Sequence, residues 1–254
     1  MKVTPVGGDC MGQVGISAKV LELNIVELEE YFKNLEIYSK EKVSCPFVVR
    51  LDGVGFGKAL KDYEQPRDPK VHMALVKTCY ELMRFFNCDA CYTTSDEISM
   101  FFLKYVPYGG RVEKIVSITA SLASANLSLR LKRPLYFDSR IVKVDFHELE
   151  KYYLYRVRIG FNNYVCQLYH KVYKDKETPH LSQMIDELKE QGIDIGKKPS
   201  WALYGSLVHW TTVEKIGYNP TTGEQVVAER RVLMATDSLE EALKIMKELS
   251  RIET

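Results

Sequence analysis

The spacing of hydrophobic residues along the chain predicts a mixed α and β protein. Hydrophobic positions recur at helical spacing over 69–86, and a run rich in alanine, serine and leucine over 111–131 indicates a second helix packed closely on a sheet. Short apolar runs typical of strands lie at 47–52, 90–93, 98–103 and 140–145. The resulting order, β-α-β-β-α-β, is the ferredoxin-like arrangement, which belongs to the α+β class.

Capping and turn signals predict further elements on both sides of this central order. Asn24 and Glu27 form a capping-box-like helix start, and Ser238 with Glu241 forms another near the C-terminus. Residues 146–173 are predicted to be mostly helix, and 206–234 to be two strands joined by a turn at 219–223. We therefore predict three parts, which are a glycine-rich tail over 1–16, a domain over 17–145 with its N-terminal helix, and an extension over 146–254 that packs on it.

Composition places this fold in a reducing, aqueous setting. Hydrophobic residues make up 46% of the chain and charged residues 27%, and no apolar run is long enough to span a bilayer. The N-terminus has no secretory signal pattern, and the six cysteines have no framework spacing, so we predict a cytoplasmic protein without a membrane partner. Cys88 and Cys91 have zinc-like spacing, but no second pair accompanies them, which favours core cysteines.

Charge is unevenly distributed although the net charge is only +1. Residues 104–176 hold 14 Lys and Arg against 6 Asp and Glu, a net charge of +8, whereas residues 1–43 have a net charge of −2, from 5 against 7. A basic segment of this kind attracts ligands rich in phosphate. A solvated face with excess lysine explains the same counts, so charge alone leaves both interpretations open.

Two acidic residues are predicted to meet at one edge of the sheet. Asp52 ends the first strand, and Asp96 lies in the turn between the second and third strands. In the ferredoxin-like order the first and second strands are parallel and the third runs antiparallel between them. The end of the first strand and this turn therefore share an edge, which brings together two carboxylates that lie 44 residues apart in the sequence.

Carboxylates in such a pair repel each other unless a cation lies between them. Mg²⁺ suits the position, because it prefers oxygen ligands and is commonly held by one or two carboxylates together with substrate phosphates. Gly53, Gly55 and Gly57 follow Asp52 and would let backbone N–H groups approach a triphosphate. Each motif taken singly is also typical of an ordinary solvated turn, so the metal site depends on the two occurring together.

Two segments carry a resemblance to a known family. Residues 49–56 (VRLDGVGF) and 92–99 (YTTSDEIS) resemble the paired metal motifs of the tRNA-His guanylyltransferase superfamily. Residues 110–121 and 137–140 (FDSR) are similar to its second palm helix and to the entry of its fourth strand. The similarity spans about 22–210 and is closest to the archaeal and bacterial tRNA-His guanylyltransferase-like proteins.

The resemblance implies a polymerase or cyclase palm that binds two Mg²⁺ ions and a nucleotide. Asp52, Asp96 and the Gly53 carbonyl would be the metal ligands, and Glu97 would complete the catalytic motif. Contacts to ATP or GTP would come from the turn, the hairpin and nearby cations, namely Asp52, Gly53, Val54, Gly55, Phe56, Gly57, Lys58, Ser95, Asp96, Arg111, Lys114 and Arg140. The family often places a basic residue before the first-loop proline, where this chain has Gln65, and Arg67 is a candidate replacement.

The activity implied is 3′-5′ addition of nucleotides to the 5′ end of tRNA. A 5′-monophosphate is first activated with ATP or GTP, and the 3′-hydroxyl of an incoming nucleotide then displaces the activating group. Phe161 stands where the eukaryotic enzymes have a histidine, and Asn163 keeps one asparagine of their motif. This departure favours template-dependent repair of 5′-truncated tRNA over addition of a single G−1 to tRNA-His, which stays an alternative.

Partners and competing functions follow from the same resemblance. The 5′ end and acceptor stem of tRNA and nucleoside triphosphates would be the ligands, and a homodimer or homotetramer is expected because one subunit is small for a whole tRNA. A nucleotidyl cyclase on the same fold and a non-catalytic RNA-binding module are the alternative functions. The module would not need Asp52 or Asp96.

Overall fold

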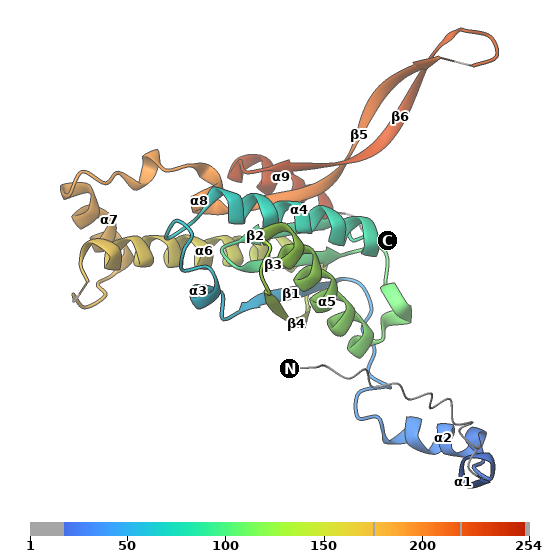
Figure 1. Ribbon diagram of the computed structural model, residues 1–254. Helices are drawn as coiled ribbons and strands as arrows, with labels where there is room; N and C mark the ends of the chain where they lie inside the picture. The colour runs from blue at the N-terminus through green and yellow to red at the C-terminus, as the bar shows by residue number, and fades with distance from the viewer. Residues whose placement is uncertain (1–17, 175, 219, 252–254) are drawn as a thin grey trace, which may run out of the picture. The chain divides into compact units, whose positions relative to one another are not determined.

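A computed structural model describes residues 18–174, 176–218 and 220–251 (Figure 1). The chain forms two compact units, which divide between Lys40 and Glu41. The predicted tail over 1–16 lies outside the described residues. None of the helices in the described part of the chain has the length and apolarity that a membrane span requires.

The first unit contains helices α1 (Ala18–Leu21) and α2 (Ile25–Leu35). Asn24 caps α2 as its sequence predicts, because its side-chain oxygen accepts a hydrogen bond from the Glu27 N–H and its amide donates to the Glu27 carboxylate. The apolar residues of α2 remain in solvent, with Ile25 72% and Phe32 61% exposed. This helix therefore owes its definition to capping and helical propensity rather than to burial.

The second unit is built on a six-stranded sheet with the order β4-β1-β3-β2-β5-β6. Its strands are β1 (Phe47–Val54), β2 (Ala90–Thr94), β3 (Glu97–Phe102), β4 (Tyr136–Lys143), β5 (Ser206–Tyr218) and β6 (Gln225–Thr236). Because β3 is antiparallel to both β1 and β2, those two strands are parallel to each other. The predicted β-α-β-β-α-β order is confirmed, and β4 begins four residues before the predicted position.

Helices α4 (Pro69–Phe86) and α5 (Val112–Leu131) cover one face of the sheet. Asp68 caps α4 through hydrogen bonds from the N–H groups of Lys70 and Val71, and Pro69 occupies the first turn, where no N–H is needed. Inward-facing residues of the strands form a core with these helices, and its fully buried members include Phe47, Leu51, Ile98, Phe102 and Leu75.

The other face of the sheet packs against α6 (Leu149–Val172), which follows the 3₁₀ turn η2 (Phe146–Glu148), and against α9 (Leu239–Ser250). Strand residues of the opposite parity form this second core, among them Val48, Tyr92 and Leu207. The C-terminal half of α6 packs on three short elements that the hydrophobic pattern does not predict. These are α7 (Leu181–Glu190), η3 (Ile195–Lys197) and α8 (Ser200–Tyr204). Two further short elements are α3 (Phe56–Ala59) and η1 (Pro107–Gly110).

The C-terminal segment completes the sheet of the palm-like domain instead of folding separately. β5 pairs with β2 over Ser206–His209, and β5 and β6 form the long hairpin that the sequence predicts. Figure 1 shows this hairpin extending past the ends of the other strands. Ser238 accepts a hydrogen bond from the Glu241 N–H and so caps the last helix, α9, as predicted.

The cysteines of the zinc-like pair are core residues. Cys88 and Cys91 are both 0% exposed, and burial raises the pKa of each thiol well above its ordinary value. Cys79 lies beside Cys91, and all three are free thiols in the core between the sheet and α4. Neutral buried thiols behave as small hydrophobic groups, so the prediction of core cysteines is confirmed.

Helix α6 lies close against the sheet at Gly160. A Cβ atom at this position would lie 2.5 Å from Thr94 Oγ1 and 2.9 Å from Thr94 Cγ2. Thr94 is only 3% exposed and branched at Cβ, so it has little room to move aside. The absence of a side chain at Gly160 therefore lets α6 lie against the end of β2, next to the hairpin that carries Asp96.

We expect Gly160→Ala to lower the free energy of unfolding by about 1–3 kcal/mol through overpacking. In a helix interior without such a contact, the same change raises the free energy of unfolding by up to about 1 kcal/mol. A decrease would therefore report the close contact with Thr94. Chemical denaturation of both proteins measures the difference. Gly57→Ala is the matched control, since nothing lies within 4 Å of its Cβ position and no loss is expected there; equal stability of the Gly160 variant and the wild type would contradict the packing argument.

Candidate active site

The end of β1 adjoins the hairpin between β2 and β3. Asp52 lies directly opposite Glu97 in the antiparallel pairing, and the Gly53 N–H donates a 3.0 Å hydrogen bond to the Asp96 carbonyl. Ser95, at the tip of the hairpin, has φ +57°, which gives the turn the tight reversal that it needs. The structure thus brings Asp52, Gly53, Ser95, Asp96 and Glu97 to one edge of the sheet.

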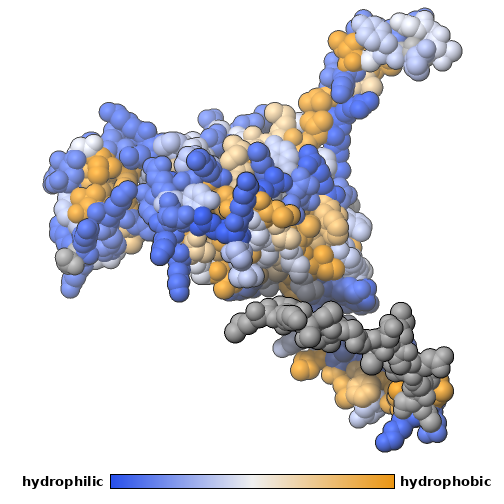
Figure 2. All heavy atoms as spheres, viewed as in Figure 1, coloured by the Kyte–Doolittle hydropathy of each residue, from blue (hydrophilic) through white to orange (hydrophobic). Residues whose placement is uncertain are grey.

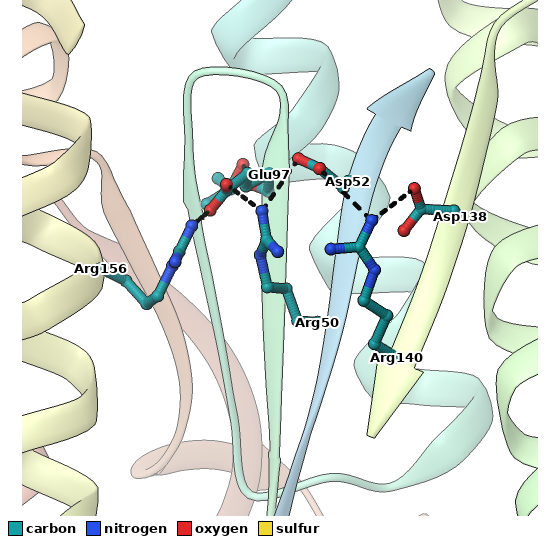
Figure 3. Close-up of polar contacts among 7 residues, drawn as sticks. Arg50, Asp52, Glu97, Asp138, Arg140 and Arg156 are labelled. Carbon is teal, nitrogen blue, oxygen red and sulfur yellow. Dashed lines mark hydrogen bonds and ion pairs between the residues drawn. The ribbon is translucent and has the colours of Figure 1, made fainter. Parts of the chain in front are cut away.

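Carboxylates and guanidinium groups alternate across this edge (Figure 3). Glu97 lies between Arg156 and Arg50, with its Oε1 2.5 Å from Arg50 Nη2 and its Oε2 hydrogen-bonded to Arg156. Arg50 Nη2 is also 3.2 Å from Asp52 Oδ1, so one guanidinium serves two carboxylates. Glu97 is therefore fixed on both sides, as a residue that positions its neighbours would be.

The outer end of this row continues onto β4. Arg140 Nη2 lies 4.0 Å from Asp52 Oδ2 and 3.0 Å from Asp138 Oδ2. The Arg140 side chain is 55% exposed, so it can turn toward a ligand without leaving a buried gap. Asp52 thereby faces a firm contact from Arg50 on one side and a loose one from Arg140 on the other.

The Asp52 carboxyl has a raised pKa, mainly because partial burial removes some of its hydration. Arg50 opposes this shift, while the carboxylates of Glu97, Asp96 and Asp138 add to it. Three neighbouring carboxylates therefore act on Asp52 at this edge, and Arg50 offsets only part of their effect and of the loss of hydration. A divalent cation would remove that imbalance.

Asp138 is a further acidic residue of the site. It lies directly opposite Asp52 in the pairing of β1 with β4, and its Oδ1 is buried with no hydrogen-bond partner. The hydrophobic pattern places the start of the fourth strand at 140, which leaves Asp138 in the preceding loop. Because β4 begins at Tyr136, Asp138 pairs with Asp52. The one sequence signal for Asp138 was the similarity of residues 137–140 to a family pattern.

Oxygen atoms suited to Mg²⁺ are present at this edge. Asp52 and Asp96 offer carboxylates, Gly53 follows Asp52 in the strand and has a backbone carbonyl, and the unpaired Asp138 Oδ1 shows that the edge has spare acceptor capacity. Within the described residues, no three His, Cys, Asp or Glu side chains converge as a closed metal cage would require. An open site with two carboxylates fits an ion that takes its other ligands from phosphates and water.

The glycine-rich turn leads from β1 into α3. Gly53 lies against the Phe56 ring, where a Cβ would be 2.7 Å from the ring, and Phe56 itself is buried. Gly55, with φ +67°, is the N-cap residue of α3, a conformation that side chains rarely adopt. Val54 and Lys58 are exposed and Gly57 has open space beside it, so the outer side of the turn is accessible to a ligand.

A cavity of about 290 Å³ opens beside Ser95 and Asp96. Its lining includes Gly57 from α3, Gln65 and Arg67 from the loop before α4, and Asn163 from α6. Arg67 donates hydrogen bonds to Thr94 Oγ1 (3.3 Å) and to the Gly160 carbonyl (3.0 Å), while its Nε is buried without a partner.

Arg67 is a cation without a counterion. No carboxylate of the described residues lies within ion-pair distance of its guanidinium, and burial lowers its pKa from the ordinary value. The neighbouring Gln65, whose amide donates to the Leu60 carbonyl, supplies no charge. A half-buried, unpaired guanidinium in a cavity beside Asp96 is suited to an anionic ligand.

Residues 161–163 divide between the core and the cavity. The Phe161 ring stacks on Tyr204 with their centroids 6.0 Å apart, whereas Asn163 lines the cavity. His72 also reaches the cavity, where it stacks on Trp201 and hydrogen-bonds Ser206, and burial lowers its pKa to about 4. The position of the eukaryotic histidine is therefore a packing position in this chain.

Arg111 and Lys114 lie at the opposite end of the domain. The carbonyl of Gly110 accepts a hydrogen bond from the Val43 N–H, which places the start of α5 near the beginning of β1. Asp52 lies five residues further along that strand than Phe47, about 17 Å at the rise of an extended chain. The structure does not bring these two cations to the edge that carries the acidic residues.

Comparisons with known proteins bear on the family and the fold of this chain. Residues 29–145 match the family model described as tRNAHis guanylyltransferase. The chain is 26% identical over 201 residues, 64% of its length and 69% of the relative, to an uncharacterized protein of Acanthamoeba polyphaga mimivirus.

Solved structures share the fold. A bacterial tRNA(His) guanylyltransferase-like protein in complex with ATP matches with a TM-score of 0.72 and 20% identity, covering 89% of this chain and 100% of that chain. The tRNA(His) guanylyltransferase of Saccharomyces cerevisiae matches with a TM-score of 0.61 and 20% identity, covering 70% of this chain and 91% of that one. These similarities confirm the α+β palm-like fold.

We expect Asp52→Asn to raise the melting temperature of the metal-free protein slightly at neutral pH. The folded-state pKa of Asp52 is raised, so its ionised form opposes folding there, and the difference should shrink on acidification toward that pKa. Mg²⁺ should stabilise the wild type but not the variant.

Thermal melts with EDTA and with Mg²⁺ measure both effects. Asp62→Asn is the control, because Arg133 holds the pKa of Asp62 below its ordinary value and its loss should not stabilise the protein. Equal Mg²⁺ stabilisation of the wild type and the Asp52 variant would contradict a metal site at Asp52.

Proposed function

We propose that this chain, whose residues 29–145 match the tRNAHis guanylyltransferase family model, is a nucleotidyltransferase of that superfamily, and that it adds nucleotides in the 3′-5′ direction to the 5′ end of tRNA by two-metal catalysis. The observation that carries the proposal is the meeting of Asp52 and Asp96 at one sheet edge beside a cavity with an unpaired Arg67. Carboxylates and a cation so arranged can hold both the ions and the phosphates of a nucleotide.

The chemistry has two phosphoryl transfers. In the first, a 5′-phosphate oxygen of the RNA attacks the α-phosphorus of ATP or GTP and pyrophosphate leaves. In the second, the 3′-hydroxyl of an incoming nucleoside triphosphate attacks the activated 5′-phosphorus and the mononucleotide leaves. Mg²⁺ would lower the pKa of the attacking hydroxyl and neutralise charge on the leaving oxygen.

The residues of this chain would bind and orient the reactants. Asp52, Asp96 and the Gly53 carbonyl would hold the ions, and Glu97 would keep Arg50 and hence Asp52 in place. The turn from Gly53 to Gly57, with Lys58 and Ser95, would face the triphosphate, and Arg140 could turn from Asp138 to a phosphate oxygen. Arg111 and Lys114 would have no part in this site within one subunit.

The choice of activating nucleotide and of RNA substrate is proposed from the related structures and from the residues near the cavity. The bacterial relatives were solved in complex with ATP and with GTP, which supports either nucleotide as the activating group here. Phe161 packs on Tyr204 and cannot act as the eukaryotic histidine does, so we favour repair of 5′-truncated tRNA over addition of G−1. Addition of G−1 is the alternative within the same chemistry.

We expect nucleotide addition to a 5′-monophosphorylated tRNA that lacks its first nucleotide, only with Mg²⁺ present. Asp96→Asn should reduce the rate by about 10³-fold, the equivalent of about 4 kcal/mol, because metal ions supply several kcal/mol of transition-state stabilisation. Denaturing gels with labelled nucleotide follow the product.

Asp186→Asn, at an exposed position on α7, is the control and should leave the rate unchanged. A cyclic nucleotide formed from ATP without RNA would instead indicate a cyclase. RNA binding with no incorporation in the wild type would indicate a binding module.

We expect Arg67→Gln to raise the KM for the nucleoside triphosphate about tenfold, because a hydrogen bond to a charged group contributes about 1.5–3 kcal/mol. Adding Gln65→Lys in the same protein should restore part of the affinity, since it returns a cation to the cavity lining. Steady-state kinetics measures both variants, and a melting curve checks folding because Arg67 also contacts Thr94 and Gly160. An unchanged KM in a folded Arg67→Gln protein would remove Arg67 from the binding site.

A further inference from the structure

A basic groove lies between α4 and α5, outside the site described above. It is open, has a volume of about 950 Å³, and its lining carries four cations, Lys70, Lys77, Arg130 and Lys132. The other lining residues are Tyr63, Pro69, Met73, Ala74 and Leu131, so no acidic side chain contributes to the lining. We infer that this groove binds the phosphate backbone of the RNA substrate where it leads away from its 5′ end, an inference that rests on the proposed function.

Three of the four cations have no counterion. Within the described residues, Lys70, Lys77 and Lys132 form no ion pair, and Arg130 is 3.6 Å from Glu81, which Arg84 contacts more closely at 2.8 Å. The neighbouring Arg133 differs, because Asp62 holds it in a two-point ion pair at 2.6 and 2.8 Å. The positive charge of the groove is therefore available to a ligand, whereas the charge of Arg133 is neutralised by Asp62.

The cations are spaced along two helices that converge here. Lys70 and Lys77 are two turns apart on the same side of α4, about 10 Å along the helix axis, with Met73 between them. Arg130 is in the last turn of α5 and Lys132 caps its C-terminus with φ +54°. This spread suits several phosphates of one strand rather than a single small anion.

The groove adjoins the cavity beside Asp96. Tyr63 lines both hollows, and Arg133 stacks on its ring 4.8 Å from the centroid, which holds the ring in place. Pro69 and Lys70 of the groove directly follow Arg67 and Asp68 of the cavity lining. A 5′-phosphate near Asp96 would therefore have the next phosphates of its strand over the groove.

The surrounding surface favours a polyanion over an apolar partner. The view in Figure 2 faces α4 and α5, and hydrophilic residues predominate where the two helices approach each other. Met73, 52% exposed, is the large hydrophobic side chain that the lining offers to solvent. Backbone binding by unpaired lysine and arginine is independent of base sequence, which suits an enzyme that must accept the body of a tRNA while reading only its end.

The test compares RNA binding by two triple variants that lose equal charge. The groove variant carries Lys70→Gln, Lys77→Gln and Lys132→Asn, because asparagine tolerates the positive φ at the last position. The control carries Lys189→Gln, Lys244→Gln and Lys247→Gln, three lysines on α7 and α9 that form no ion pair in the described residues. None of the six side chains is buried, so both proteins should melt like the wild type.

Fluorescence anisotropy with a 5′-monophosphorylated tRNA, at a series of salt concentrations, measures the Kd. We expect the groove variant to bind at least about tenfold more weakly than the control. The slope of log Kd against log salt should fall by about 2–3, roughly 0.7–0.9 for each phosphate that the variant no longer neutralises. Binding of a nucleoside triphosphate should be the same for both variants.

Two outcomes would overturn the inference, and they differ in what they say of the proposed function. If the wild type extends the tRNA but the groove variant keeps its affinity and salt slope, the groove is a solvated face and the catalytic proposal stands. If the wild type neither binds nor extends RNA, both proposals fail together.

Discussion

Pairing of β1 with β3 is the constraint on which the site depends. The register sets Asp52 opposite Glu97, and the hydrogen bond from Gly53 to Asp96 closes the hairpin against the end of β1. Because side chains alternate along a strand, a shift of one residue would turn Asp52 toward the core under α4 and α5 and bring Leu51 to the site. The buried residues on both faces, such as Leu51 and Val48, make that shift costly, so core packing fixes the positions of the acidic groups.

Alternating charge makes the acidic edge tolerable within the fold. Arg156, Arg50 and Arg140 separate Glu97, Asp52 and Asp138, so each carboxylate has a cation beside it. The balance is uneven, since Glu97 is held from both sides while the pKa of Asp52 stays raised. Breaking a buried pair leaves an uncompensated charge, and Arg156, 5% exposed, is the member of the row most dependent on its partner. The excess negative charge at Asp52 therefore opposes folding, whereas the same charge would favour binding of a cation.

Positive charge is divided between two regions with different surroundings. Arg67 is inside the cavity and is held by neutral acceptors, which leaves its charge for an anion. The groove cations lie in solvent on α4 and α5, where their effect on an anion is screened by salt. A nucleotide held in the cavity and a polyanion lying over the groove would therefore respond differently to ionic strength.

Local signals in the sequence determined most of the fold. The caps at Asn24 and Ser238 predict the starts of two helices, and the hydrophobic period predicts the order of strands and helices. That order alone implies the sheet topology and the meeting of Asp52 with Asp96. These features rest on near neighbours in the chain or on topology.

The features that required the tertiary structure depend on contacts between elements that are distant in the sequence. The place of Asp138 opposite Asp52 follows from where β4 begins, and the isolation of Arg67 from how α6 packs at Gly160. The distance of Arg111 and Lys114 from the site follows from the direction in which α5 runs, which a motif does not encode.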